Sequence, residues 1–390
     1  MERYCTAMKN RKPDKVPSRL FAAEVAGKSV GYNAQEVTHD LDKGLEAVIQ
    51  MCKQVNLDAT VVNMVYVWTG MTESYGTRYY KVPGIDIDED EPFQYWEPRT
   101  EEEGFMKADE YDRFIEDPNE FVMNVWAPRI SKYFVAPGEA NTTKNNLAWL
   151  KGGISMMTYF NKLFAQVDRM KNECGTVWAI AGALKAPFDI LADKFRGFRG
   201  IAYDIHRQPA KLLKATEAVM PHMKWNALAG ADPEKKVPIS LWMHRGATGF
   251  FSEENFERFF WPTLKQVTEE IFAEGYQVLY YAEGKWGRNF KHFLQLPEGS
   301  IIYHCDKDGI FEAHRVLGEK FAISGGIPND LLALGTPEEV KASVKKVIDS
   351  EVAKDGGYIL DAEAIIQQDA KLENVKAMVE ACDEYGVYKS

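Results

Sequence analysis

The second half of the chain alternates short apolar segments with longer amphipathic ones, and this alternation constrains the fold more than any other feature. The apolar segments are rich in β-branched and aromatic residues, as strands are, and the stretches between them have helical patterning. Strand, helix and strand in succession imply parallel strands with crossover helices. With 59–67 earlier in the chain, they fit a closed (β/α)8 TIM barrel better than an open sheet. The segments are 177–181, 238–243, 277–281, 300–303, 321–323 and 358–360.

Two helix starts can be read directly from the sequence. Thr336 is a typical N-cap, Pro337 suits the first helical position, and Glu339 completes a capping box, so a helix is predicted from here to Gly356-Gly357. Ser252 opens another helix that runs toward Gly275. No GxGxxG or P-loop follows any predicted strand, which disfavours nucleotide binding.

Residues 70–150 break the regular pattern. They contain a Tyr- and Thr-rich stretch, an acidic run at 85–91 and a polar, turn-like segment at 141–146. The acidic run is typical of a solvated surface. We predict a single TIM-barrel domain over 1–390, with an N-terminal extension and with 70–150 as an excursion over the barrel mouth.

Composition excludes several classes of protein. The 47 Lys and Arg against 58 Asp and Glu give a net charge of −11, which would repel nucleic acid. No apolar run approaches the roughly 18 residues of a membrane span, and the N-terminus lacks a signal peptide. The five scattered cysteines indicate reduced thiols. We therefore expect a cytoplasmic protein that binds neither membrane nor nucleic acid.

Polar side chains that follow the predicted strands are the candidates for an active site, because a parallel barrel places its site at the carboxyl ends of the strands. They include two histidines, a thiol and several carboxylates, which are the donors of a divalent metal site. The candidates are His244, Arg245, Glu283, His304, Cys305, Asp306, Asp361 and Glu363.

Strand alternation separates the candidates that follow 300–303. It puts His304 and Asp306 on one face and Cys305 on the other, which favours His304 as the ligand. The alternative for either strand-end histidine is a hydrogen-bonded core residue.

An earlier strand end carries aromatic and amide side chains. Asn63, Tyr66 and Trp68 suit an apolar substrate pocket, and Trp96 could add to it. Filling the barrel core is the alternative for Tyr66.

Several motifs resemble the uroporphyrinogen decarboxylase superfamily, and in particular its corrinoid-dependent methyltransferase branch. The resemblance covers nearly the whole chain and implies a TIM barrel. The matching motifs are Phe198-Arg199-Gly200 with Asp204, 249–253, Gly325-Gly326-Ile327-Pro328, 335–340 and 356–360.

Departures from the superfamily patterns indicate the branch. The arginine pair that decarboxylases use for substrate propionates is missing after Arg19, and the cysteines of the thiol methyltransferases are missing as well. Glu283 stands near one of those cysteine positions, and His304 follows after twenty intervening residues. This spacing is similar to the zinc pattern of the O-demethylase methyltransferases. The acidic residue expected about fifteen positions before Glu283 is not matched, so we take His244 as the third ligand, with Asp306 and Asp361 as alternatives.

The resemblance implies transfer of a methyl group from a methoxylated aromatic compound to the Co(I) corrinoid of a separate corrinoid protein. Zinc would polarise the ether oxygen. Glu283 and Asp306 are the predicted catalytic residues, and Asn63, Tyr66, Trp68 and Arg245 the predicted substrate-binding residues.

Other outcomes stay open. The donor could instead be a methylamine, methanol or a methylthiol, or the chain could be a decarboxylase-like tetrapyrrole-binding protein. Members of the superfamily are often dimers, which makes a homodimer an expected state.

Overall fold

The strands form a ring of parallel strands in this computed structural model, which describes residues 1–61, 68–77 and 79–388. One sheet has the order β11-β10-β9-β8-β7-β6 and a second has the order β1-β2-β5, with parallel pairing throughout both. The strands are β1 (Arg19–Leu20), β2 (Ala59–Thr60), β5 (Val177–Trp178), β6 (Ala183–Lys185), β7 (Ile239–Met243), β8 (Val278–Ala282), β9 (Ile301–Cys305), β10 (Ala322–Ile327) and β11 (Tyr358–Ala362).

The two sheets close into one barrel. Single parallel bridges join the residues that flank β1 to β11 and to the segment after it: Ser18 pairs with Leu360, and Ala22 pairs with Ile366. On the other side, β5 pairs with β2 and β6 pairs with β7, and these two short strands lie on one stretch of chain that turns at Gly182 (φ +96°). With that stretch counted as one strand, the described residues give the eight parallel strands of a TIM barrel. The predicted fold is confirmed.

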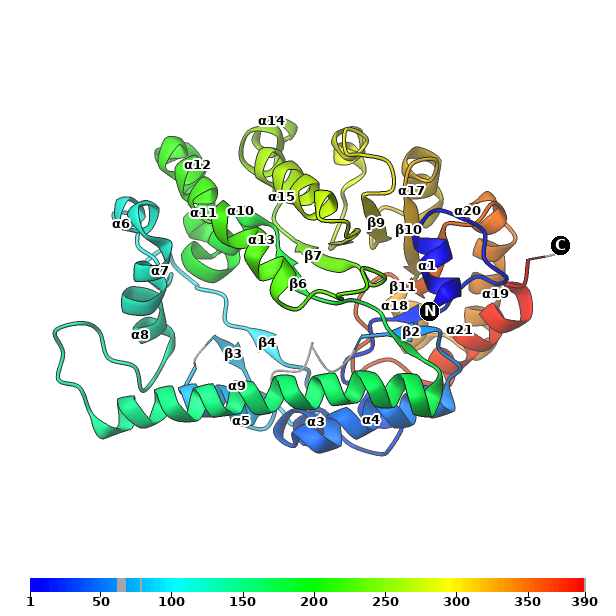
Figure 1. Ribbon diagram of the computed structural model, residues 1–390, viewed down its shortest axis with the longest axis horizontal. Helices are drawn as coiled ribbons and strands as arrows, with labels where there is room; N and C mark the ends of the chain where they lie inside the picture. The colour runs from blue at the N-terminus through cyan, green and yellow to red at the C-terminus, as the bar shows by residue number, and fades with distance from the viewer. Residues whose placement is uncertain (62–67, 78, 389–390) are drawn as a thin grey trace.

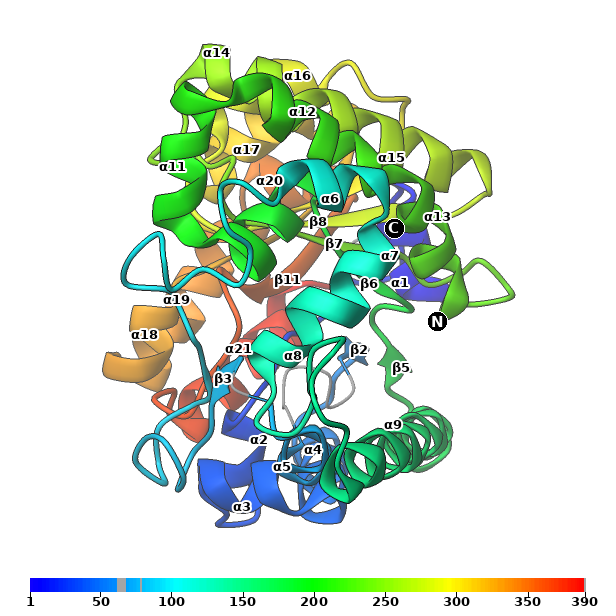
Figure 2. The same ribbon diagram turned by 90° about the vertical axis from the view of Figure 1, so that its left-hand side faces the viewer.

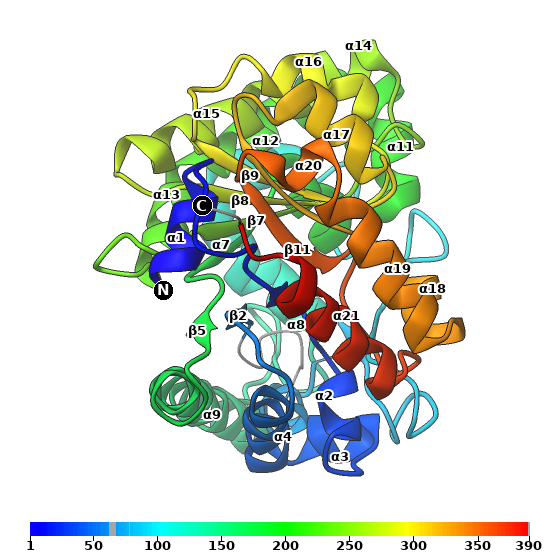
Figure 3. The same ribbon diagram turned by 90° about the vertical axis from the view of Figure 1, so that its right-hand side faces the viewer.

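Helices cover the outside of the ring (Figures 1 and 3). The capping box of α19 is present, since the Thr336 side chain accepts from the Glu339 N–H and the Glu339 side chain accepts in return. That helix ends at Ile348, earlier than predicted, because Ser350 starts the separate α20 (Glu351–Lys354). The outer helices are α4 (Leu41–Gln54), α11 (Gly197–Arg207), α12 (Pro209–Ala218), α13 (Met220–Ala229), α15 (Trp261–Ala273), α17 (Ile310–Leu317), α19 (Pro337–Ile348) and α21 (Leu372–Tyr385).

The helix α1 (Glu2–Met8) closes the bottom of the barrel, at the amino ends of the strands. The Tyr4 hydroxyl donates to the Ala179 carbonyl (2.9 Å), and the Gln277 amide donates to the Met8 carbonyl (2.8 Å). Tyr4 joins the apolar interior of the barrel, where Phe21 and Tyr281 also lie. In the described part of the chain, α1 thus covers the amino ends of the strands, and the opposite end is where a parallel barrel places its site.

Residues 69–142 leave the barrel pattern, as the sequence predicts for most of this stretch. They contain α5 (Thr69–Tyr75), the antiparallel pair β3 (Tyr80–Lys81) and β4 (Gln94–Tyr95), and the short helices α6 (Tyr111–Glu116), α7 (Pro118–Phe121) and α8 (Ala127–Ile130). Figure 2 shows α6 to α8 in front of the barrel, where α6 contacts α12.

The long helix α9 (Thr143–Arg169) returns the chain to the barrel beside α5 and α4, along the lower edge of Figure 1. None of the described helices combines the length and the apolar character that crossing a membrane requires.

Buried charges fasten the excursion to the barrel helices. The Arg196 guanidinium, which is fully buried, pairs with Asp204 (2.5 Å) and with Glu101 of the excursion (2.9 Å). It also donates to the Met106 carbonyl (2.6 Å). The Tyr111 hydroxyl completes the cluster by donating to Asp204 (2.7 Å).

Candidate active site at the barrel mouth

Three side chains, Asp193, His244 and Glu283, form a continuous series of polar contacts at the mouth of the barrel, at the ends of β7 and β8. His244 directly follows β7, and Glu283 directly follows β8. The His244 Nε2 atom lies 3.0 Å from Glu283 Oε2, and its Nδ1 atom lies 2.8 Å from Asp193 Oδ2. The imidazole is therefore held between two carboxylates, with Glu283 at the more exposed end (39% of its side chain, against 8% for Asp193).

A second buried carboxylate shapes the turn after β7. Asp189 lies at the end of α10 (Pro187–Asp189), and its two oxygens accept the backbone N–H groups of His244 (2.6 Å) and Arg245 (2.9 Å). Because both donors belong to the backbone, Asp189 fixes the direction of the turn and with it the position of the His244 ring.

Cations gather around Asp193, which lies in the π-helical segment Ile190–Arg196. Lys185, the last residue of β6, approaches Asp193 Oδ2 to 2.6 Å, and Arg245 Nε donates to Asp193 Oδ1 at 2.9 Å. The Arg245 guanidinium also reaches Glu97 of the excursion at 3.0 Å. Arg245 thus forms ion pairs with two carboxylates. Its role in substrate binding stays a prediction.

These contacts shift the protonation of the site. Burial lowers the pKa of His244, but its hydrogen bonds with Asp193 and Glu283 outweigh burial and raise that pKa to about 9. Burial works against ionisation of Asp193 too, yet the contacts with His244, Lys185 and Arg245 hold its pKa well below the usual range. Burial and the neighbouring Asp193 charge raise the pKa of Asp189 to about 6.

Asp306 lies level with Glu283 on the neighbouring strand. The register pairs Ala282 with Cys305, so the residues that follow them are neighbours at the mouth. Asp306 Oδ2 accepts the Gly284 N–H (2.7 Å), while its buried Oδ1 makes no hydrogen bond and lies 3.7 Å from Lys307 Nζ. Burial raises the pKa of Asp306.

His304 lies deeper in the barrel than Glu283. The register places His304 opposite Tyr281, two residues before Glu283, and the two rings stack with centroids 4.4 Å apart. Its Nε2 contacts the Glu363 carbonyl (3.0 Å), and its Nδ1 contacts Arg19 (2.9 Å). The structure therefore brings His244 to Glu283 but does not bring His304 to that pair, because both His304 ring nitrogens have partners in the core.

Asp361, the alternative ligand, belongs to the same deep layer as His304. It is fully buried, and its Oδ2 pairs with Arg19 at 2.9 Å. Burial raises the pKa of Asp361 to about 7, although the Arg19 charge acts in the opposite direction. Within the described residues, Asp361 thus forms the ion pair with the buried Arg19, and His304 accepts one of its hydrogen bonds.

The geometry of His244 and Glu283 fits two ligands of one metal ion. Zinc binds imidazole nitrogen and carboxylate oxygen at about 2.0–2.2 Å, and two donor atoms 3.0 Å apart can both reach such an ion. Asp193 on the far ring nitrogen has the position of the carboxylate that orients a metal-bound histidine. Among the described residues, no third His, Cys, Asp or Glu completes a group around this pair with all ligand atoms within 4.8 Å.

Of the other residues predicted to bind substrate, the structure describes the aromatic candidates Trp68 and Trp96. Asn63 and Tyr66 lie outside the described residues. Trp68 precedes α5, is half-buried and packs against the main hydrophobic core, and Trp96 is 41% exposed. Tyr95, an aromatic residue that the sequence did not single out, lies beside these cations, with its ring centroid 5.5 Å from Lys185 Nζ.

Sequence reasoning missed Lys185, Asp189 and Asp193. The apolar segment 177–181 placed the strand end at Ala181, whereas β6 continues to Lys185. Asp189 and Asp193 are four residues apart, shortly after the strand end at Lys185. With the strand end placed at Lys185, this spacing would have predicted two carboxylates on one helical face at the barrel mouth.

Comparisons with known proteins agree with this fold. The family described as Uroporphyrinogen decarboxylase (URO-D) matches residues 141–385. A methyltransferase from Methanosarcina mazei has a similar structure, with a TM-score of 0.63 and 16% sequence identity over 98% of each chain. The curated proteins give no match.

Proposed function

Because the chain belongs to the uroporphyrinogen decarboxylase family, we propose that it is a methyltransferase built on the barrel of that family. It would move a methyl group from a methoxylated aromatic compound to the Co(I) corrinoid of a partner corrinoid protein. The similarity in fold to a methyltransferase from Methanosarcina mazei supports the choice of reaction class.

The observation that carries this proposal is the Asp193–His244–Glu283 chain. A decarboxylase of tetrapyrroles needs free cations for the substrate carboxylates. At this mouth, Arg245 is already paired with Asp193 and Glu97, and the deeper Arg19 is fully buried against Asp361. Because Arg245 and Arg19 are paired with carboxylates, they are poorly suited to bind a polyanionic substrate. The Glu283 carboxylate and the His244 imidazole are instead the donor types that a metal ion binds.

His244 and Glu283 would hold the zinc ion, and Asp193 would keep the imidazole in place. When bound, zinc supplies a Lewis acid for the ether oxygen, which makes the phenolate a better leaving group. The methyl carbon leaves that oxygen without its bonding electrons and is bonded by the electron pair of Co(I). Asp306, which lies level with Glu283 at the mouth and has one buried oxygen without a hydrogen bond, would supply the proton for the departing phenolate.

The experiment mixes the purified protein with a Co(I) corrinoid protein and follows the cobalt absorption spectrum. The donors are methoxyarenes, a methylamine, methanol and a methylthiol. We expect methyl-cobalt to form with a methoxyarene, and Glu283→Gln or His244→Gln to slow this by about 100-fold or more.

Glu97→Gln is the matched control, because it removes a carboxylate of the same mouth that does not touch His244. If the corrinoid protein were methylated by another donor and not by a methoxyarene, the proposed substrate class would be wrong and the proposed methyl transfer would stand. Absence of methylation from every donor would overturn the proposal.

A further inference from the structure

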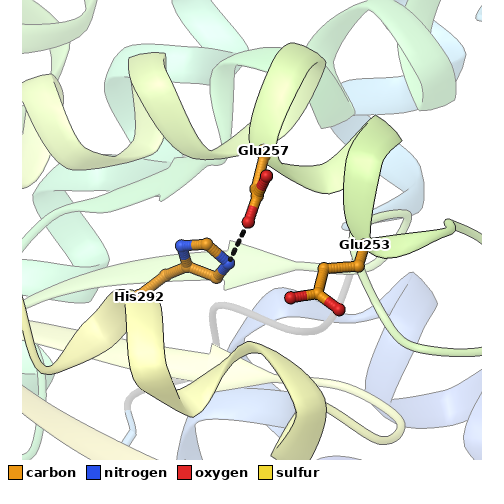
Figure 4. A group of neighbouring side chains, drawn as sticks. All are labelled: Glu253, Glu257 and His292. Atoms are coloured by element: carbon orange, nitrogen blue, oxygen red, sulfur yellow. Dashed lines mark ion pairs between the residues drawn. The ribbon is translucent and has the colours of Figure 1, made fainter.

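A second group of metal-ligating side chains lies outside the barrel mouth, between the segments that follow β7 and β8 (Figure 4). It consists of Glu253, Glu257 and His292, whose ligand atoms all lie within 4.8 Å of one another. Among the described residues, this is the group of three that meets that condition.

The local fold explains why these side chains meet. The Ser252 side chain caps α14 (Glu253–Asn255), and the helix continues without a break through Phe256–Phe260 into α15. Glu253 and Glu257 are four residues apart on it, so both carboxylates project from one face. His292 comes from α16 (Phe290–Phe293), on the next connection of the barrel.

His292 is the unusual member. Its side chain is only 6% exposed, and neither ring nitrogen makes a hydrogen bond. Aromatic rings pack around it, with the Phe256 centroid at 5.2 Å and the Trp261 centroid at 5.7 Å. A buried polar group without a hydrogen bond costs free energy, and an ion is one of the explanations for such a group.

The open side of the imidazole faces the carboxylates. Figure 4 shows the His292 ring directed at Glu257, and the Nε2 atom lies 3.5 Å from Glu257 Oε1.

A cation already occupies the carboxylate side. Lys291 Nζ pairs with Glu253 and lies 3.7 Å from Glu257 Oε1. The Lys291 side chain is 56% exposed, so it can turn outward into water when another cation takes its place. In this structure, the Lys291 ammonium thus balances part of the negative charge of the two carboxylates.

We propose that Glu253, Glu257 and His292 form a second binding site for a divalent transition metal of the zinc type, with one nitrogen and two oxygen ligands and its remaining positions open to water. The site does not depend on the proposed reaction. Glu253 follows His244 by nine residues (253 − 244), and His292 follows Glu283 by nine (292 − 283), so a bound ion would tie together the two segments that carry the pair at the mouth.

The test uses full-length protein that has been freed of metal and carries Glu283→Gln, which removes one of the two proposed zinc ligands at the barrel mouth. Calorimetric titration with zinc chloride should show about one ion per chain. Adding Glu257→Gln should weaken that binding about tenfold or more. Adding Glu254→Gln, which removes an exposed carboxylate from the same helical turn, should leave it unchanged.

Two further variants keep the test independent of folding. His292→Phe preserves an aromatic ring against Phe256 and Trp261, so it should lose zinc binding while keeping the thermal unfolding midpoint. Lys291→Met removes the competing cation and should tighten zinc binding. The proposal is overturned if the Glu283→Gln protein binds no zinc, or if the Glu257→Gln and Glu254→Gln proteins bind it equally well.

Discussion

His244 contacts one carboxylate through each ring nitrogen, and this makes Asp193 as important to the site as Glu283. A carboxylate behind a metal-bound histidine fixes its ring and raises its basicity. We expect Asp193→Asn to lower the zinc affinity of the mouth site by about 10- to 100-fold. Zinc titration in the His292→Phe background isolates this site. Glu97→Gln is the control, and equal affinities in the two variants would show that Asp193 has no such role.

Glu24 gives a pH-dependent prediction that is independent of the mouth. It is fully buried, and burial raises its pKa from 4.5 to about 7. The pKa of Glu24 is higher in the folded than in the unfolded protein. The contribution of the protonated carboxyl to the free energy of unfolding is therefore complete below the unfolded pKa of 4.5, and it is lost as the pH rises through 7. The difference of 2.5 (7 − 4.5) corresponds to about 3 kcal/mol.

Glu24→Gln removes this titration. Relative to the unmodified chain, the variant should gain about 3 kcal/mol of unfolding free energy between pH 4.5 and pH 8. Urea unfolding at both pH values measures the gain. The exposed Glu298→Gln should show none, and a Glu24→Gln gain equal at both pH values would contradict the assignment.

The residue pattern predicted part of the candidate site and could not have predicted the rest. Strand ends located His244 and Glu283, because the carboxyl ends of barrel strands share one rim. The twenty-residue spacing between Glu283 and His304 favoured them as partners, but spacing does not report depth along the barrel. His304 lies two residues deeper than Asp306, the residue level with Glu283, and it contacts Arg19, which lies far away in sequence.

At the level of strands, β10 depends on a glycine. Gly325 has a φ of +94°, and a Cβ there would lie 2.5 Å from the Cys305 carbonyl oxygen of β9. Gly299 has a φ of +67° with nothing within 4 Å of its Cβ position, so it shares the strained backbone but not the crowding.

Gly325→Ala should therefore lower the unfolding free energy by about 3 kcal/mol or more, and Gly299→Ala by about 1 kcal/mol. Denaturant unfolding of the two variants separates the crowding from the backbone strain. Equal losses of unfolding free energy in the two variants would mean that β9 moves away from the added methyl group without a measurable cost.

The sequence predicted the presence of the strands and the first residues of two helices correctly, but it did not predict where the strands end. Thr336 and Ser252 cap helices as predicted, since capping depends on a few neighbouring residues. Of the predicted strand 177–181, only Val177–Trp178 is a strand (β5), and a second strand, β6, follows after Gly182, because the chain there changes its partner from β2 to β7. Which strand lies alongside is a property of the whole barrel, and a local pattern does not contain it.

For the molecule as a whole, the attachment of the excursion depends on Arg196. Replacing it with Met would leave Asp204 buried beside Glu101 without its cation. We expect Arg196→Met to lower the unfolding free energy by about 3–5 kcal/mol. Arg207, which is 63% exposed and pairs with the same Glu101 at 3.3 Å, is the matched control, and Arg207→Met should cost less than about 1 kcal/mol. Urea unfolding compares them, and similar losses would contradict the role of the buried cluster.

The helix at the bottom of the barrel has a consequence for how the chain assembles during synthesis. α1 leaves the ribosome before the strands of this barrel, yet Tyr4 bonds to Ala179 and Met8 to Gln277. Until those residues have been synthesised, the apolar side of α1 has none of these partners. This helix is thus translated long before the barrel residues that hold it, and it can reach its final place only after residue 277 has been synthesised.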